Sequence, residues 1–85
     1  MGELKITEYT AGLYSSTKVE AACGADAVAT YDRPGFVYPA GNVRVNYSSV
    51  GSLSIADAKA FHAALGKAIE IAEGYQRELE SGNDL

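Results

Sequence analysis

The side chains best suited to catalysis are few in this chain, and their spacing matches no complete catalytic motif. Residues 15–18 (Ser-Ser-Thr-Lys) have the serine-to-lysine spacing of serine acylases, which carry it at the start of a helix together with further motifs. Here the four residues fall in an expected strand, without those motifs. Cys23 and His62, the single cysteine and histidine, could form a thiolate–imidazole pair. We favour a buried structural thiol and a histidine at the border of the core.

No metal or cofactor site is predicted either. A zinc site needs three or four cysteine, histidine or carboxylate ligands at suitable spacing, and this chain has one cysteine and one histidine. The nine glycines form neither the dinucleotide-binding pattern G-x-G-x-x-G nor the phosphate-binding pattern G-x-x-x-x-G-K-[ST]. We therefore expect no catalytic residue, no cofactor and no metal, which favours a protein that is not an enzyme.

The charge distribution argues against binding to nucleic acids or membranes. The chain has 11 acidic and 7 basic residues, and its net charge of −4 falls entirely in the last segment. There a single base, Arg77, faces five acids: Glu70, Glu73, Glu78, Glu80 and Asp84. Phosphate groups require clustered lysines and arginines. A lone cysteine, and the lack of an apolar run of about 20 residues, favour a cytoplasmic protein without a membrane span.

The length of 85 residues indicates a single domain, residues 1–85, with a modest core. Hydrophobic periodicity divides it into a strand-rich part over residues 3–48, a helix over about residues 55–80 and a polar tail over residues 81–85. The predicted fold class is α+β. We expect an antiparallel sheet of four to five strands with one long C-terminal helix packed on one face.

Alternation of apolar and polar residues, with glycine and proline at the ends, predicts the strands. The candidate segments are residues 4–10, 14–22, 25–32, 36–38 and 43–48. A short Pro-Ala-Gly-Asn turn separates the last two segments, so we expect residues 36–38 and 43–47 to pair as a hairpin.

The helix is predicted to begin after Ser54, whose hydroxyl suits the N-cap, with the carboxylate of Asp57 in the first turn. Its larger apolar side chains gather on one face at 100° per residue. We expect Phe61, Leu65, Ile69 and Ala72 to be buried against Val43 and Val45. A helix of about 26 residues is ~39 Å long, whereas a compact domain of this size is about 30 Å across. The helix should therefore project beyond its sheet.

Two features indicate a surface for a protein partner. Six tyrosines suit an interface because tyrosine combines a large apolar area with a polar tip, although tyrosine also fits strands well. Small residues along the helix would let a second helix approach, although alanine is also a good helix former. The candidate interface residues are Tyr14, Tyr38, Tyr47, Ala60, Ala64, Ile71, Tyr75 and Leu79.

One stretch resembles a known group of proteins. A strand containing Val43 and Val45 is followed, from Leu53, by the pattern L-S-x-x-x-A-x-x-F-x-x-A-L. This combination covers less than half of the chain and resembles small uncharacterised actinobacterial and actinophage proteins. The resemblance implies a small accessory protein, encoded by a phage, and carries over no catalytic residue.

These observations lead to two hypotheses. In the first, the chain is a non-catalytic module that binds another protein of unknown identity, such as a host protein modulated by a phage, and forms a homodimer through antiparallel C-terminal helices. In the alternative, it is a small homo-oligomeric enzyme or ligand-binding protein with a pocket between subunits. A pocket lined by His62 and strand tyrosines would favour the alternative. A flat exposed patch would favour the first.

Overall fold

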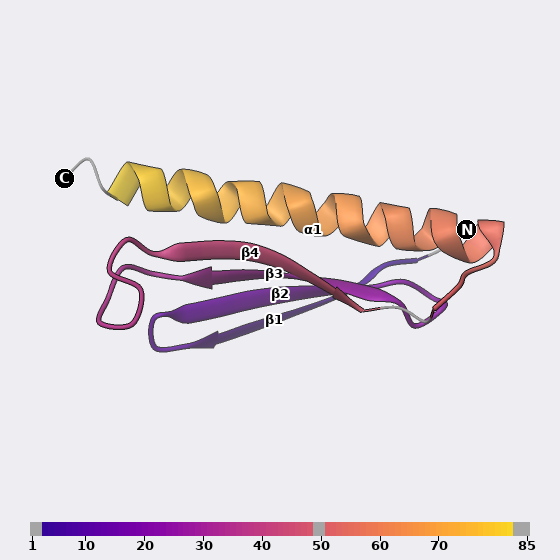
Figure 1. Ribbon diagram of the computed structural model, residues 1–85, viewed down its shortest axis with the longest axis horizontal. Helices are drawn as coiled ribbons and strands as arrows, with labels where there is room; N and C mark the ends of the chain where they lie inside the picture. Colours follow the sequence, from indigo (N-terminus) through magenta and orange to yellow (C-terminus); the bar gives the residue numbers. More distant parts are fainter. Residues whose placement is uncertain (1–2, 49–50, 83–85) are drawn as a thin grey trace.

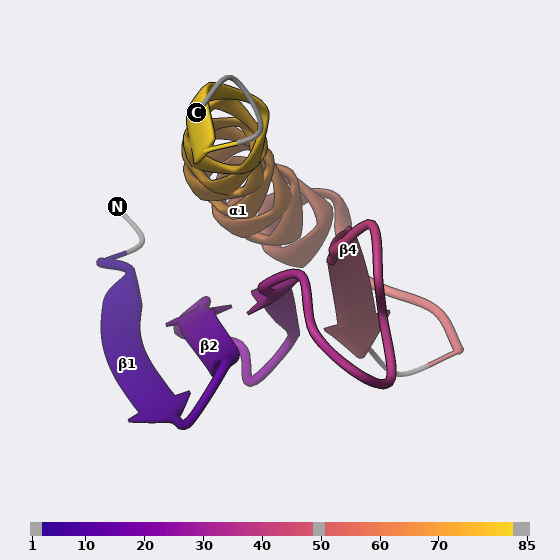
Figure 2. The same ribbon diagram turned by 90° about the vertical axis from the view of Figure 1, so that its left-hand side faces the viewer.

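The computed structural model describes residues 3–48 and 51–82, which form one sheet and one helix. The elements in chain order are β1 (Lys5–Ala11), β2 (Tyr14–Glu20), β3 (Asp26–Asp32), β4 (Asn42–Ser48) and α1 (Ile55–Gly82). Each strand pairs antiparallel with the next, in the order β1-β2-β3-β4. The helix lies along one face of the sheet (Figure 1, Figure 2). The predicted α+β fold is therefore confirmed, with four strands.

Alternate side chains of the central strands point toward the helix. Thr17 and Val19 in β2 are buried, and the register places them opposite the buried Ala29 and Ala27 of β3. The helix packs on β2, β3 and β4, whereas every residue of β1 is exposed. The sheet is therefore covered on one face only, and on that face only in part.

The predicted hairpin between residues 36–38 and 43–47 is wrong. β4 pairs along its full length with β3, and residues 33–41 form the connecting loop. Pro34 and Pro39 stand on either side of the Phe-Val-Tyr segment and have no backbone N–H to donate, so a ladder of hydrogen bonds cannot continue through them. The seven-residue β3 offers β4 a complete partner instead.

The helix rests on the sheet through small side chains. Ala64 and Ala68 are fully buried and pack with Val19, Ala21 and Ala27 in one core cluster. Methyl groups on both sides of the contact let the helix lie close to the strands. The core is consequently thin, and Val19 is its largest fully buried side chain.

The predicted core face of the helix is only partly correct. Ala72 is buried as expected, but Ile69 is 44% exposed, and Phe61 and Leu65 are half-buried. The expected partners in β4, Val43 and Val45, are half-buried as well. The helix is turned so that its alanines, rather than its largest side chains, face the sheet.

Both ends of the helix are supported by turns and loops. At its start, the Asp57 N–H donates to Ser54 Oγ at 3.1 Å, which confirms the predicted N-cap. Near its end, the buried Leu79 lies over Gly41 of the β3–β4 loop. The molecule measures 46 × 19 × 18 Å and is thus more elongated than predicted. Residues 83–85 of the predicted polar tail lie outside the described residues.

Over the described ranges, no helix combines the length and apolarity needed to cross a membrane.

Because Ala64 is fully buried between helix and sheet, Ala64→Leu should destabilise the fold by about 1–3 kcal/mol through overpacking. Its neighbour Ala63 is exposed on the same helix, so Ala63→Leu should change the free energy of unfolding by less than about 0.5 kcal/mol. Urea denaturation followed by circular dichroism measures both variants. Equal stabilities would show that the helix does not rest on this face.

Candidate functional site

The small-residue stripe of the helix, predicted as an interface, contacts the chain's own sheet. Ala64 is fully buried, and Ala60 and Ile71 are half-buried against the core cluster. These three side chains therefore do not form a free surface for a second helix. The physical reason is that small side chains allow close approach to a sheet as well as to a helix.

The two candidate residues near the end of the helix are also engaged within the chain. The Tyr75 ring stacks on Tyr31, with centroids 5.2 Å apart, and its hydroxyl lies 2.7 Å from Thr17 Oγ1. Leu79 is buried over the β3–β4 loop. The loop extends beneath the last turns of the helix, so the overhang expected from the helix length is covered by the same chain.

The structure records no hydrogen bond between the candidate chemical groups over the described residues, and the Cys23 thiol lies 3.9 Å from the Asp57 carbonyl instead. Cys23 is exposed in the β2–β3 turn, so the predicted buried thiol is wrong, and His62 is exposed on the helix. In β2, the buried Ser15 faces the helix, whereas Lys18 points to the opposite face and pairs there with two carboxylates. Within the described part of the chain, no three histidine, cysteine or acidic side chains are grouped so as to hold a metal ion.

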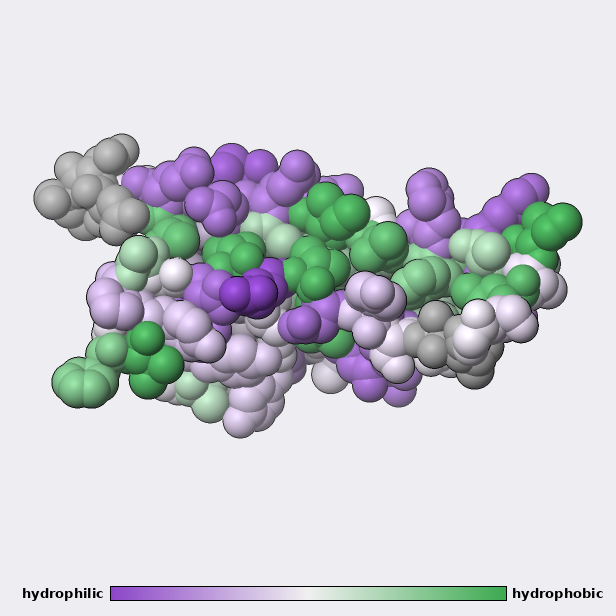
Figure 3. Space-filling model, viewed as in Figure 1, coloured by the Kyte–Doolittle hydropathy of each residue, from purple (hydrophilic) through white to green (hydrophobic). Residues whose placement is uncertain are grey.

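Four exposed large apolar side chains, including the most exposed one, Phe36, lie together at one end of the sheet. In the β3–β4 loop, Phe36 is 100% and Val37 78% exposed, and the nearby Leu13 of the β1–β2 turn is 54% exposed. We call these three residues and Tyr38 the apolar tip. Figure 3 shows hydrophobic residues projecting at this end of the molecule. Grouped apolar side chains in water are unfavourable and often mark a binding surface.

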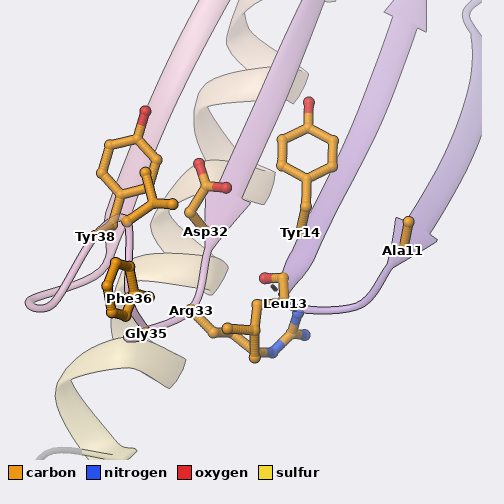
Figure 4. Close-up of a pocket in the computed structure, with 9 residues that line it drawn as sticks. Ala11, Leu13, Tyr14, Asp32, Arg33, Gly35, Phe36 and Tyr38 are labelled. Carbon is orange, nitrogen blue, oxygen red and sulfur yellow. Dashed lines mark hydrogen bonds between the residues drawn. The ribbon is translucent and has the colours of Figure 1, made fainter.

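An open pocket of about 340 Å³ lies beside the apolar tip, on the sheet face opposite the helix. Its lining combines the tip residues with Ala11, Tyr14, Asp32, Arg33 and Gly35. Figure 4 shows the Asp32 carboxylate between the rings of Tyr14 and Tyr38, whose hydroxyls point the same way. Apolar walls with one carboxylate and two hydroxyls can hold an apolar side chain and hydrogen-bond to its polar neighbours.

Arg33 ties the base of the loop to the β1–β2 turn, β2, β3 and α1. Its Nη1 donates to Ser15 Oγ at 2.9 Å and to the Leu13 carbonyl at 3.4 Å. Its guanidinium lies 4.7 Å from the centre of the Tyr31 ring, and its Nη2 is 3.6 Å from Glu78 Oε1. The pairing with Glu78 is weak because both groups are solvated, so the hydrogen bonds and the ring contact hold the side chain.

Backbone hydrogen bonds give the loop a defined shape. The Arg33 N–H donates to the Leu13 carbonyl at 3.0 Å, which joins the loop to the β1–β2 turn. The Gly35 and Gly41 N–H groups both donate to the Tyr38 carbonyl, at 3.0 and 2.9 Å. Gly41 has a φ of +79°, a conformation that glycine adopts without strain. The loop thus presents Phe36 from a constrained backbone.

The structure brings only some of the predicted tyrosines together. Tyr14 and Tyr38 line the pocket, whereas Tyr47 is 72% exposed near the other end of β4. Sequence reasoning does not identify Phe36 and Val37, because a short apolar run beside a turn is also typical of a strand. The signal that could identify them is a proline on either side of the apolar segment. Proline has no backbone N–H to donate, so the segment is poorly suited to pair within a sheet.

Comparison of this chain with protein-family models, with curated proteins and with solved structures finds no match.

We expect Arg33→Ala to loosen the loop without unfolding the sheet. Losing the hydrogen bonds to Ser15 and Leu13 should speed amide hydrogen exchange at Gly35 and Gly41 by about tenfold, since 1.4 kcal/mol corresponds to a factor of ten. Arg44→Ala is the control, because Arg44 is exposed on β4 and its side chain donates to Asn42 of the same strand rather than to the loop. Unchanged exchange in Arg33→Ala would contradict the role of this side chain.

Proposed function

We propose that the protein is a non-catalytic binding module that engages another protein through the apolar tip. The observation that carries this proposal is Phe36, whose side chain is fully exposed on a loop constrained by backbone hydrogen bonds. Burying such a side chain in a partner contributes about 1.5–3 kcal/mol. A few aromatic anchors commonly supply most of the binding energy of an interface. A constrained loop also loses little conformational entropy on binding.

The pocket beside the tip indicates the chemistry of the partner. Asp32 forms no ion pair among the described residues, and its carboxylate stands between the rings of Tyr14 and Tyr38. A partner that fits both features has an apolar groove for Phe36 and, next to it, a hydrogen-bond donor or a basic side chain. A basic side chain placed there would be attracted both by the negative charge of the carboxylate and by the electron-rich faces of the aromatic rings.

A second candidate function is the binding of a small ligand in the same pocket. Its volume of about 340 Å³ and its convergent polar groups, Asp32, Tyr14 and Tyr38, favour this reading. The pocket is lined by one chain and does not include His62, so it differs from the pocket between subunits that the sequence suggested. Phe36 and Val37 also line the pocket, but they remain 100% and 78% exposed, so a protein that covers the whole tip would bury more apolar surface than a small ligand.

The proposal is tested by affinity purification from a lysate of the source cells, with quantitative mass spectrometry of the retained proteins. The double variant Phe36→Ser, Val37→Ser should lose specific partners by at least about 100-fold, since two buried apolar side chains contribute about 3 kcal/mol or more. Ile55→Ser is the matched control, because Ile55 is 79% exposed, as Val37 is 78% exposed, but lies at the start of the helix.

Retention of the same proteins by the wild type and the double variant would refute the role of the tip. Loss of the same proteins from Ile55→Ser would show that the apolar contact is unspecific. Circular dichroism of each variant checks that the fold is kept, as expected for substitutions at exposed positions.

A further inference from the structure

The sheet has two outer strands, β1 and β4. The helix packs on β2, β3 and β4, so one flank of the helix adjoins the β4 edge, while β1 stands apart from it (Figure 2). Among the described residues, no strand pairs with the outer edge of β4. Such an edge presents backbone N–H and C=O groups that can pair with a further strand.

A row of apolar side chains, which we call the apolar seam, follows this edge. It consists of Val43, Val45 and Tyr47 in β4 and Phe61, Leu65 and Ile69 in α1. Tyr47 is 72% and Ile69 44% exposed, and the other four are half-buried. Figure 3, viewed from the β4 side, shows hydrophobic residues in a row between the helix and the strands. The seam is separate from the apolar tip.

We propose that the β4 edge and the apolar seam bind a second copy of this chain about a two-fold axis at Val45. In this arrangement, β4 pairs antiparallel with β4 of the second copy. The two sheets become one sheet of eight strands, with both helices on the same face. The apolar seams of the two copies then face each other and exclude water.

The sequence of β4 is complementary to itself in this register. On the helix side, Val45 faces its own counterpart and Val43 faces Tyr47 of the second copy, so apolar side chains meet. On the other side, Arg44 faces Asn46 of the second copy, so no like charges are opposed. In this register, each of the seven residues of β4 lies opposite a residue of the second copy's β4.

The β1 edge does not satisfy the same conditions. Pairing of β1 with itself along its full length places Glu8 opposite Glu8 of the second copy, and directly opposed like charges destabilise a strand pair. Glu8 is paired with the buried Thr17 and therefore lies on the helix-facing side of the sheet, where no helix covers β1. Self-complementarity thus selects β4.

The helices meet favourably in this arrangement. Tyr47 contacts Phe61, with ring centroids 6.3 Å apart, and α1 runs antiparallel to β4 (Figure 1). From this contact, Val45 lies about 7 Å back along β4, and Leu65 lies about 6 Å onward along α1. Because the two elements run in opposite directions, both steps lead the same way along the molecule. Leu65 and Ile69 are therefore the seam residues of the helix nearest the two-fold axis at Val45. The antiparallel copies place their acidic C-terminal segments at opposite ends, where they do not repel each other.

The proposed dimer would also carry its two apolar tips at opposite ends. If the tip binds a partner, as proposed above, the dimer is bivalent, and a partner with repeated sites would be held more tightly than one with a single site. Only this consequence rests on the proposed function. The dimer itself rests on β4 and the seam.

The mass of the full chain in solution tests the dimer, by light scattering on a size-exclusion peak at micromolar concentration. Ile69→Glu is compared with Ile6→Glu, because the two isoleucines are 44% and 46% exposed and Ile6 lies on β1. The wild type and Ile6→Glu should show twice the chain mass of 8.9 kDa. Ile69→Glu should raise the dimer Kd at least about tenfold, because it places a carboxylate in an apolar contact.

A wild-type mass of 8.9 kDa would overturn the proposal, as would a dimer that survives Ile69→Glu. Dissociation by Ile6→Glu alone would move the interface to β1 and overturn it too. The two tests are independent: because Phe36 lies outside the seam, the dimer mass is expected to be the same whether or not the Phe36 variant loses a binding partner.

Disulfide cross-linking in a Cys23→Ser background tests the register. In Val45→Cys, the two cysteines face each other across the axis with Cα atoms about 5 Å apart, which a disulfide can bridge. In Val43→Cys, each cysteine lies four strand positions, about 13 Å, from its counterpart and cannot be bridged. We expect a covalent dimer from Val45→Cys only. Cross-linking from position 43 and not from position 45 would overturn the proposed axis.

Discussion

The contact between the alanines of α1 and the small residues of β2 and β3 determines the rest of the structure. Ala64 and Ala68 lie on Ala27 and Val19, so the helix comes close to the strands here and leaves no room for larger side chains at this contact. The core is thin for that reason. Tyr31 and Leu79 are buried nearer the end of the helix, and the other larger apolar residues lie mainly at the flank of the helix and in the β3–β4 loop.

The width of the sheet adds a second constraint. Four strands spaced about 4.8 Å apart are wider than one helix with a diameter of about 10 Å can cover with its apolar face. The two edges differ accordingly. On its helix-facing side the uncovered β1 combines Ile6 with Glu8 and Thr10, whereas β4 presents three apolar residues there. The helix thus leaves two edges exposed: the β1 edge, which is partly polar and readily hydrated, and the β4 edge, which is apolar.

Sequence reasoning predicts the elements better than their contacts. The four strands, the single helix and its N-cap at Ser54 follow from alternation, turn residues and the change of period, and the structure confirms them. The hairpin involving residues 36–38 fails because strand propensity does not account for the missing N–H groups of the flanking prolines. Of the tip, Tyr38 is predicted as an interface residue, whereas Phe36 and Val37 are missed because they fit a strand pattern equally well. The arrangement of Tyr14, Asp32 and Tyr38 depends on the β3–β4 connection and could not be derived from spacing alone.

The orientation of the helix is the most informative of these differences. Hydrophobic periodicity centres the buried face on the large residues Phe61, Leu65 and Ile69, whereas the sheet contacts the alanines beside them. From Ala60 to Ile69 the apolar arc spans about 180° at 100° per residue, wider than the stripe of roughly 100° typical of a helix that packs on one side only. A single sheet covers the alanine half of this arc. In the proposed dimer, the second copy covers the other half, so that every apolar residue that the pattern assigns to the interior has a contact.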